Sequence, residues 1–106
     1  MVFQTYGEVA MSKLTLEKVR TIIDGETAFA QKWDDNRPEG SLADAQKPVE
    51  YWLYMMETYL MAARNSMVLN YDKTVALANL RCVLSLGEKC AMFHGLPARE
   101  DEKDIY

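Results

Sequence analysis

The chain has 106 residues, a formal net charge of −4, 49% hydrophobic residues and 26% charged residues. This length fits one domain with a modest core, and the composition excludes disorder of the whole chain. The acidic balance, without a cluster of lysine and arginine, argues against duplex DNA or RNA as a partner. We see no apolar run of membrane-spanning length and no signal peptide, so we expect a cytoplasmic protein without a membrane partner.

The two cysteines and the single histidine limit the chemistry that the chain can support. Cys82 and Cys90 fall in one predicted helix, about 12 Å apart along its axis at 1.5 Å per residue, which is too far for a disulfide bond. Reduced thiols are therefore expected. One histidine and no C-x-x-C motif make a zinc site improbable.

The first predicted helix extends from Leu16 to Trp33. Thr15 is a suitable N-cap, and apolar residues recur at helical spacing through this segment. Gly25 weakens the middle of the helix by about 1 kcal/mol relative to alanine, so a bend could occur there. Residues 34–48 follow as a loop, because they contain two prolines and one glycine. Loops of this length in small domains are often functional or mobile.

The second predicted helix covers residues 49–69 and is apolar around nearly its whole circumference. Its coiled-coil-like stripe consists of Leu53, Met56, Leu60, Ala63 and Met67. Aromatic and methionine side chains cover much of the remaining surface, and two partner helices from one small chain cannot cover them all. We therefore expect this helix to lie at an interface between subunits.

The third predicted helix covers residues 73–94 and follows a short turn, with Asp72 as its N-cap. The short turn predicts that the second and third helices are antiparallel neighbours. Gly95 and Pro97 mark the end of the third helix. The expected organisation is an N-terminal extension or arm (1–14), one all-α domain (15–97) and a charged tail (98–106). The expected fold is a long antiparallel helical hairpin plus an N-terminal helix, assembled into an oligomeric helical bundle.

Three segments, "ETAFAQKWDD", "EYWLYMMETYLMAAR" and "NLRCVLSLGEKCAMFHG", together resemble the small MazG-like proteins of phages and bacteria. These belong to the all-α nucleoside triphosphate pyrophosphohydrolase superfamily. The resemblance covers residues 19–93, and its motifs are a Q-x-K-W-like signature, a W-L pair and the apolar part of an E-L-x-x-V run. The matching residues are Gln31, Lys32, Trp33, Trp52, Leu53, Leu80 and Val83.

The resemblance implies that an active relative would carry E-x-x-E on one helix and E-x-x-D on the next. Residues three apart share a helix face, so two such pairs would surround Mg²⁺ with carboxylate oxygens. At these positions this chain has Glu57, Leu60, Asn79 and Cys82. Only Glu57 keeps the expected carboxylate. We therefore expect no catalytic residues, no metal ligands and no cofactor.

Eight residues are candidate contacts for a small nucleotide-type ligand. Arginine and lysine could bind phosphate, aromatic rings could stack on a base, and polar side chains could discriminate between bases. The candidates are Lys32, Arg64 and Arg81 for phosphate, Trp33, Tyr54 and Tyr59 for stacking, and Glu57 and Asn79 for discrimination.

Each candidate also has a structural interpretation. Glu57 could pair with Arg64 or Arg81, and Asn79 could hydrogen-bond across helices and fix their register. Trp33 could anchor the core, and Lys32 could be solvated. The tyrosines of the second helix, together with Trp52, could be core or interface residues.

The favoured interpretation is a non-catalytic nucleotide-binding protein of MazG-like ancestry that forms a homo-oligomer. In a phage, such a protein could sequester a nucleotide or cyclic nucleotide signal. Two alternatives stay open. One is a nucleoside triphosphate pyrophosphohydrolase with atypical ligands, which would need Mg²⁺. The other is an oligomeric protein–protein interaction module.

Overall fold

The computed structural model describes residues 12–100, and within this range it contains three α-helices and no β-strand. The helices are α2 (Leu16–Asp35), α3 (Val49–Asn70) and α4 (Lys73–His94). A short 3-10 helix, η1 (Asp44–Gln46), lies in the loop before α3 and was not predicted. The all-α class is confirmed, and each predicted helix end lies within two residues of the observed one.

Local side-chain chemistry sets the starts of α2 and α4. Thr15 Oγ1 accepts a hydrogen bond from the Lys18 backbone N–H (3.1 Å), and Asp72 Oδ1 accepts one from the Val75 N–H (3.1 Å). Both predicted N-caps are therefore correct. The residue after the last residue of α4 is Gly95. Its φ of 91° is a conformation that glycine adopts without steric cost.

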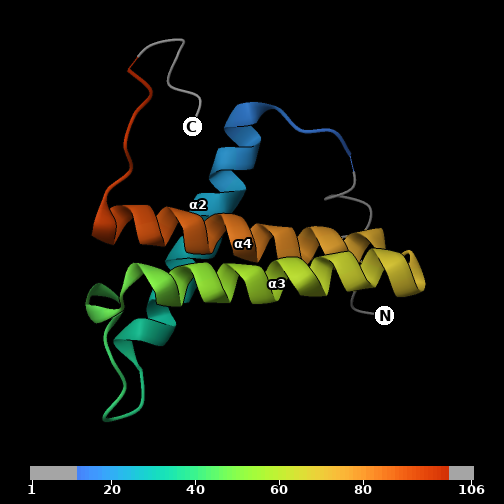
Figure 1. Ribbon diagram of the computed structural model, residues 1–106. Helices are drawn as coiled ribbons and strands as arrows, with labels where there is room; N and C mark the ends of the chain where they lie inside the picture. Colours follow the sequence, from blue (N-terminus) through green and yellow to red (C-terminus); the bar gives the residue numbers. More distant parts are fainter. Residues whose placement is uncertain (1–11, 101–106) are drawn as a thin grey trace.

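Helices α3 and α4 lie side by side along their lengths (Figure 1), joined by the two residues between them. Near the start of α3, Trp52 stacks on Phe93 near the end of α4, with ring centroids 6.1 Å apart. Further along, Gly87 leaves room for Met56, because a Cβ at Gly87 would lie 3.6 Å from the Met56 sulfur. The two helices therefore run in opposite directions.

The face that α3 turns to the core differs from the predicted stripe. Trp52 and Ala63 are buried and Met56 is half-buried, whereas Leu53 and Leu60 are more than half exposed. Met56 and Ala63 belong to the predicted stripe, so the buried face overlaps that stripe in part and is rotated from it toward Trp52. Because α3 is apolar on several sides, its periodicity could not select the face that contacts α4.

Helix α2 crosses α4 steeply (Figure 1) and packs against it without burying any of its own residues completely. It is unbroken through Gly25, the residue at which a bend was considered. Among the described residues, three polar contacts connect the helices, and one of them joins Thr27 Oγ1 to Glu88 Oε1 (2.5 Å). Thr27 Oγ1 and Ser85 Oγ are 3.0 Å apart, and Arg81 Nε lies 2.9 Å from Glu26 Oε1.

Most of the predicted N-terminal arm and the last six residues of the predicted tail lie outside the described residues. Within the described range, we find no helix that combines the length and the apolar character needed to cross a bilayer.

Candidate functional site

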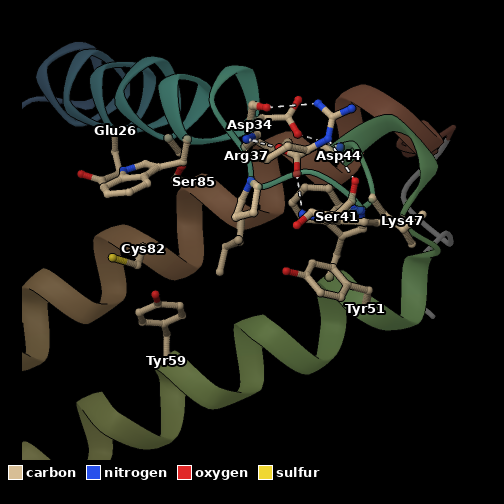
Figure 2. Close-up of a pocket in the computed structure, with 17 residues that line it drawn as sticks. Glu26, Asp34, Arg37, Ser41, Asp44, Lys47, Tyr51, Tyr59, Cys82 and Ser85 are labelled. Atoms are coloured by element: carbon tan, nitrogen blue, oxygen red, sulfur yellow. Dashed lines mark hydrogen bonds and ion pairs between the residues drawn. The ribbon is translucent and has the colours of Figure 1, made fainter.

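A cavity of about 330 Å³ lies between the C-terminal half of α2, the loop at 36–48, the N-terminal half of α3 and the middle of α4 (Figure 2). Its volume is at the lower end of the range of about 300–1,000 Å³ found for small-molecule sites. Charged, aromatic and small polar side chains line it together, and they come from all four segments. The loop thus connects two helices and also forms one wall of the cavity.

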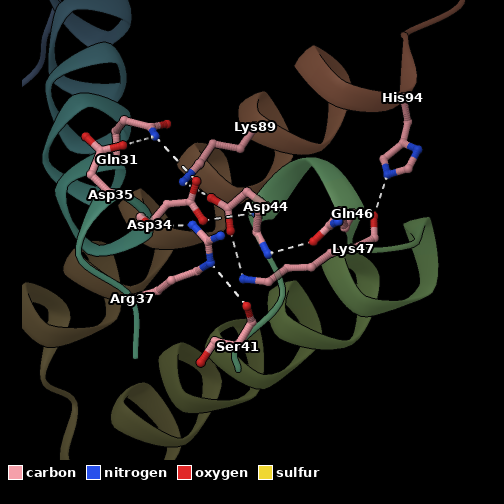
Figure 3. Close-up of polar contacts among 11 residues, drawn as sticks. Gln31, Asp34, Asp35, Arg37, Ser41, Asp44, Gln46, Lys47, Lys89 and His94 are labelled. Carbon is pink, nitrogen blue, oxygen red and sulfur yellow. Dashed lines mark hydrogen bonds and ion pairs between the residues drawn. The ribbon is translucent and has the colours of Figure 1, made fainter. Parts of the chain in front are cut away.

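One carboxylate in this wall pairs with two lysines (Figure 3). Asp44 Oδ1 lies 2.7 Å from Lys47 Nζ, and Asp44 Oδ2 forms an ion pair with Lys89 Nζ. Asp44 and Lys89 are each only 5% exposed. Taking two charges out of water is costly unless they are paired, so this pairing is needed for the loop to pack against α4.

Burial alone would raise the pKa of the Asp44 carboxyl, but hydrogen bonds and charges from Lys47 and Lys89 outweigh burial and hold its pKa below the ordinary value of 3.8. Burial would likewise lower the pKa of Lys47, yet Asp44 keeps that pKa above its ordinary value. Both groups are therefore charged at neutral pH.

Hydrogen bonds from the end of α2 hold the loop in place (Figure 3). Asp34 Oδ1 accepts the backbone N–H of Asp44 at 3.0 Å. Arg37 donates through Nη1 to the Asp34 carbonyl (3.2 Å) and through Nε to the Ser41 carbonyl (3.1 Å). Within the described residues, Arg37 Nη2 has no partner. Part of the guanidinium is thus free to bind a ligand at the mouth of the cavity.

Two buried donors of the cavity wall have spare capacity. The indole N–H of Trp52, a residue only 2% exposed, has no acceptor among residues 12–100. The Lys89 ammonium can donate three hydrogen bonds, and Asp44 is its ion-pair partner in the described range. Buried donors without acceptors are uncommon and costly, so the Trp52 N–H is an exception in this wall, whereas Lys89 has Asp44 as its acceptor.

Aromatic rings form the apolar part of the wall. Trp33 is 70% exposed at the end of α2, and Tyr51 and Tyr59 come from α3. Lys47 Nζ lies 4.7 Å from the centroid of the Tyr51 ring, within cation–π range. Sequence reasoning considered Trp33 as a core anchor. Its exposure contradicts that interpretation and leaves its ring available for stacking.

The inner wall of the cavity is formed by α4. The Thr27 hydroxyl donates to Glu88 Oε1 (2.5 Å), so its contact with Ser85 at 3.0 Å requires Ser85 to be the donor.

Burial raises the pKa of the Cys82 thiol, and the charge of Glu26 raises it further. Cys82 is therefore a protonated and weakly nucleophilic group at neutral pH.

The structure brings two of the eight candidate residues to the cavity, namely Trp33 and Tyr59. Arg81 borders it indirectly, because Arg81 Nε lies at ion-pair distance from Glu26, although its N–H points too far aside for a hydrogen bond. The other five do not line the cavity; they are Lys32, Tyr54, Glu57, Arg64 and Asn79.

Two structural expectations for these residues differ from what is observed. Asn79 Nδ2 donates to the Val75 carbonyl of its own helix (3.0 Å) instead of bonding across helices. Arg81 pairs with Glu26 and not with Glu57. Glu57 and Arg64 are exposed, and neither has an ion-pair partner within residues 12–100.

Sequence reasoning missed six charged residues that line the cavity. They are Glu26, Asp34, Arg37, Asp44, Lys47 and Lys89. A signal for one of them exists, because Lys89 continues the helical spacing of Cys82 and Ser85 on a largely apolar helix. A lysine at such a position predicts a buried carboxylate partner. Nothing in the sequence identifies that partner as Asp44.

In the described part of the chain, no three histidine, cysteine, aspartate or glutamate side chains lie close enough to hold a metal ion. Comparison with profiles of known protein families, with curated proteins and with solved structures finds no significant match to this chain.

Proposed function

We propose that the protein binds a nucleotide in the cavity between α2, the loop, α3 and α4, and that it does so without transforming it. The observation that carries this proposal is the Asp44 wall. Two ammonium groups share one carboxylate there, which leaves a net charge of +1 on these three groups, beside a buried indole N–H that has no acceptor among residues 12–100. This charge favours a phosphate, which is anionic and accepts several hydrogen bonds.

The remaining wall supports a nucleotide over a simple anion. Trp33 offers an exposed ring on which a base can stack, and stacking of this kind contributes about 1–3 kcal/mol per base. Arg37 lies in the same wall, with Nη2 unused by the loop. The carboxylate of Glu26 could accept hydrogen bonds from the sugar or the base. Phosphate contacts are therefore assigned to Arg37, Lys47 and Lys89, in preference to Lys32 and Arg64.

Binding without catalysis follows from the MazG-like resemblance, which is part of the proposal. At the positions where an active relative would place four acidic ligands, this chain has one glutamate, a leucine, an asparagine and a cysteine. Such a set is poorly suited to Mg²⁺, which prefers oxygen ligands in octahedral geometry. A nucleotide-binding scaffold that has lost its acidic set could still sequester a nucleotide or cyclic nucleotide.

The proposal is tested by a thermal-unfolding screen with nucleoside mono-, di- and triphosphates and cyclic nucleotides, with and without Mg²⁺. A ligand at one hundred times its Kd adds about 2.7 kcal/mol to the free energy of unfolding. For a domain of this size, that corresponds to a rise in Tm of about 10 °C or more. If no nucleotide raises the Tm, the proposal is wrong. Metal-dependent turnover of a nucleotide would instead establish the enzyme alternative.

Two pairs of variants place the ligand. Trp33→Ala and Arg37→Gln should each weaken binding about ten-fold or more, because they remove a stacking surface and a charged donor. Phe29→Ala and Arg20→Gln are the matched controls, since Phe29 and Arg20 are exposed on α2 and do not line the cavity. If a variant and its control lose the same amount of affinity, the nucleotide binds outside this cavity.

A further inference from the structure

Helix α3 carries an apolar surface on the side turned away from the core. Leu53, Leu60, Met61 and Val68 are all more than half exposed. A contiguous exposed surface of large apolar side chains usually marks an interaction site. Its occupant can be inferred from the order of the residues along the helix.

The exposed residues of α3 are ordered so that a second, antiparallel copy of the helix would place complementary residues opposite them. A point midway between Leu60 and Met61 is equidistant from Glu57 and Arg64, and also from Leu53 and Val68. At about 100° per residue, Glu57 and Arg64 lie within about 20° of each other on the helix surface. Reversing the helix about this point therefore exchanges opposite charges with one another and apolar residues with apolar residues.

We propose that a second copy of this chain packs against this surface, with the two α3 helices antiparallel and related by a twofold axis between Leu60 and Met61. Each Leu60 then lies beside the Met61 of the other copy, and each Leu53 beside a Val68. Glu57 of each copy faces Arg64 of the other, which forms two reciprocal ion pairs on either side of the axis. The interface is isologous, as in most homodimers.

Charge decides the direction of packing. A parallel pair would bring Glu57 against Glu57 and Arg64 against Arg64, which is repulsive. The antiparallel register converts both contacts into attraction. This explains why two opposite charges without partners in the described residues lie in the middle of an apolar surface.

The dimer surface and the ligand cavity occupy different sides of α3. Trp52 and Tyr59 line the cavity, and they lie more than 120° around the helix from the midpoint of Glu57 and Arg64, counting about 100° per residue. Dimerisation therefore leaves the cavity accessible, and this inference does not depend on the nucleotide proposal.

Charge reversal tests both the partner and the register, with mass in solution measured by sedimentation velocity. The wild-type chain should sediment as a dimer. Glu57→Arg and Arg64→Glu should each sediment as a monomer, because each places like charges in both reciprocal contacts. Arg20→Glu, a reversal at an exposed residue of α2, should remain dimeric. Unchanged far-UV circular dichroism checks that the variants remain folded.

Mixing the two single variants gives the decisive result. A Glu57→Arg chain and an Arg64→Glu chain have complementary charges in both contacts, so a 1:1 mixture should form a heterodimer. The double variant Glu57→Arg/Arg64→Glu should regain the homodimer. The proposal is overturned if the wild type is a monomer, if the single reversals remain dimers, or if neither the mixture nor the double variant dimerises.

Discussion

Replacing Asp44 by asparagine should destabilise the protein more than replacing its buried partner Lys89 by methionine. Asp44→Asn removes the one carboxylate that, within residues 12–100, pairs with both lysines, and the Lys89 side chain that remains is 6% exposed. Leaving a buried charge without its partner typically costs about 3–5 kcal/mol. This is a large part of the total stability expected for a domain, about 5–15 kcal/mol.

Lys89→Met should cost less, because Asp44 then keeps Lys47 at 2.7 Å and methionine fills much of the space of the lysine stem. We expect about 1.5–3 kcal/mol, the value of a hydrogen bond to a charged group. The double variant Asp44→Asn/Lys89→Met should be more stable than Asp44→Asn alone, since it no longer buries an uncompensated ammonium group.

The free energy of unfolding of the wild type, the two single variants and the double variant is measured by urea unfolding at neutral pH, followed by far-UV circular dichroism. Equal m-values check that each protein unfolds in the same way. Lys32→Met is the matched control, because Lys32 is an exposed lysine on α2, and its loss should change stability by less than about 0.5 kcal/mol. The reasoning is refuted if Asp44→Asn costs less than Lys89→Met, or if the two substitutions are additive in the double variant.

Three further predictions concern single groups. The folded pKa of Asp44 lies below 3.8, so the stabilisation by its charge is complete above that pH and is lost as the pH falls through the folded pKa; acid titration of unfolding should show this loss in the wild type and a smaller one in Asp44→Asn. Burial raises the pKa of Cys82, so its alkylation by iodoacetamide at neutral pH, followed by peptide mass spectrometry, should be slower than that of a cysteine in an unfolded peptide; an equal or faster rate would contradict this. Asp72→Ala removes the acceptor for the Val75 N–H, so urea unfolding should show a loss of about 1 kcal/mol, and no loss would mean that the cap is unimportant.

The helices could be predicted closely because their signals are local. Thr15 and Asp72 accept hydrogen bonds from backbone N–H groups only three residues away. Gly95 directly follows His94, the last residue of α4, and forms its C-cap. Each of these interactions is complete within one turn of chain, so a short window of sequence contains all the information that it needs.

The candidate site could be predicted only in part. Trp33 and Tyr59 were identified because aromatic rings can stack on a nucleobase. The Asp44 wall was missed because its charges come from the loop and from α4. Asp44 and Lys89 are 45 positions apart, and several other acidic residues in the sequence were equally available as partners for Lys89.

By itself, the sequence of this protein determined three helices and their ends, because backbone hydrogen bonding and capping depend on neighbouring residues. It also determined that α3 is apolar around nearly its whole circumference. Only the tertiary structure decided which side of α3 meets α4, that Trp33 is exposed, and that Lys89 is buried against Asp44. These outcomes depend on which surfaces meet when helices pack. An apolar side chain is stabilised by burial against almost any apolar neighbour, so the pattern of apolar residues alone does not choose among the available surfaces.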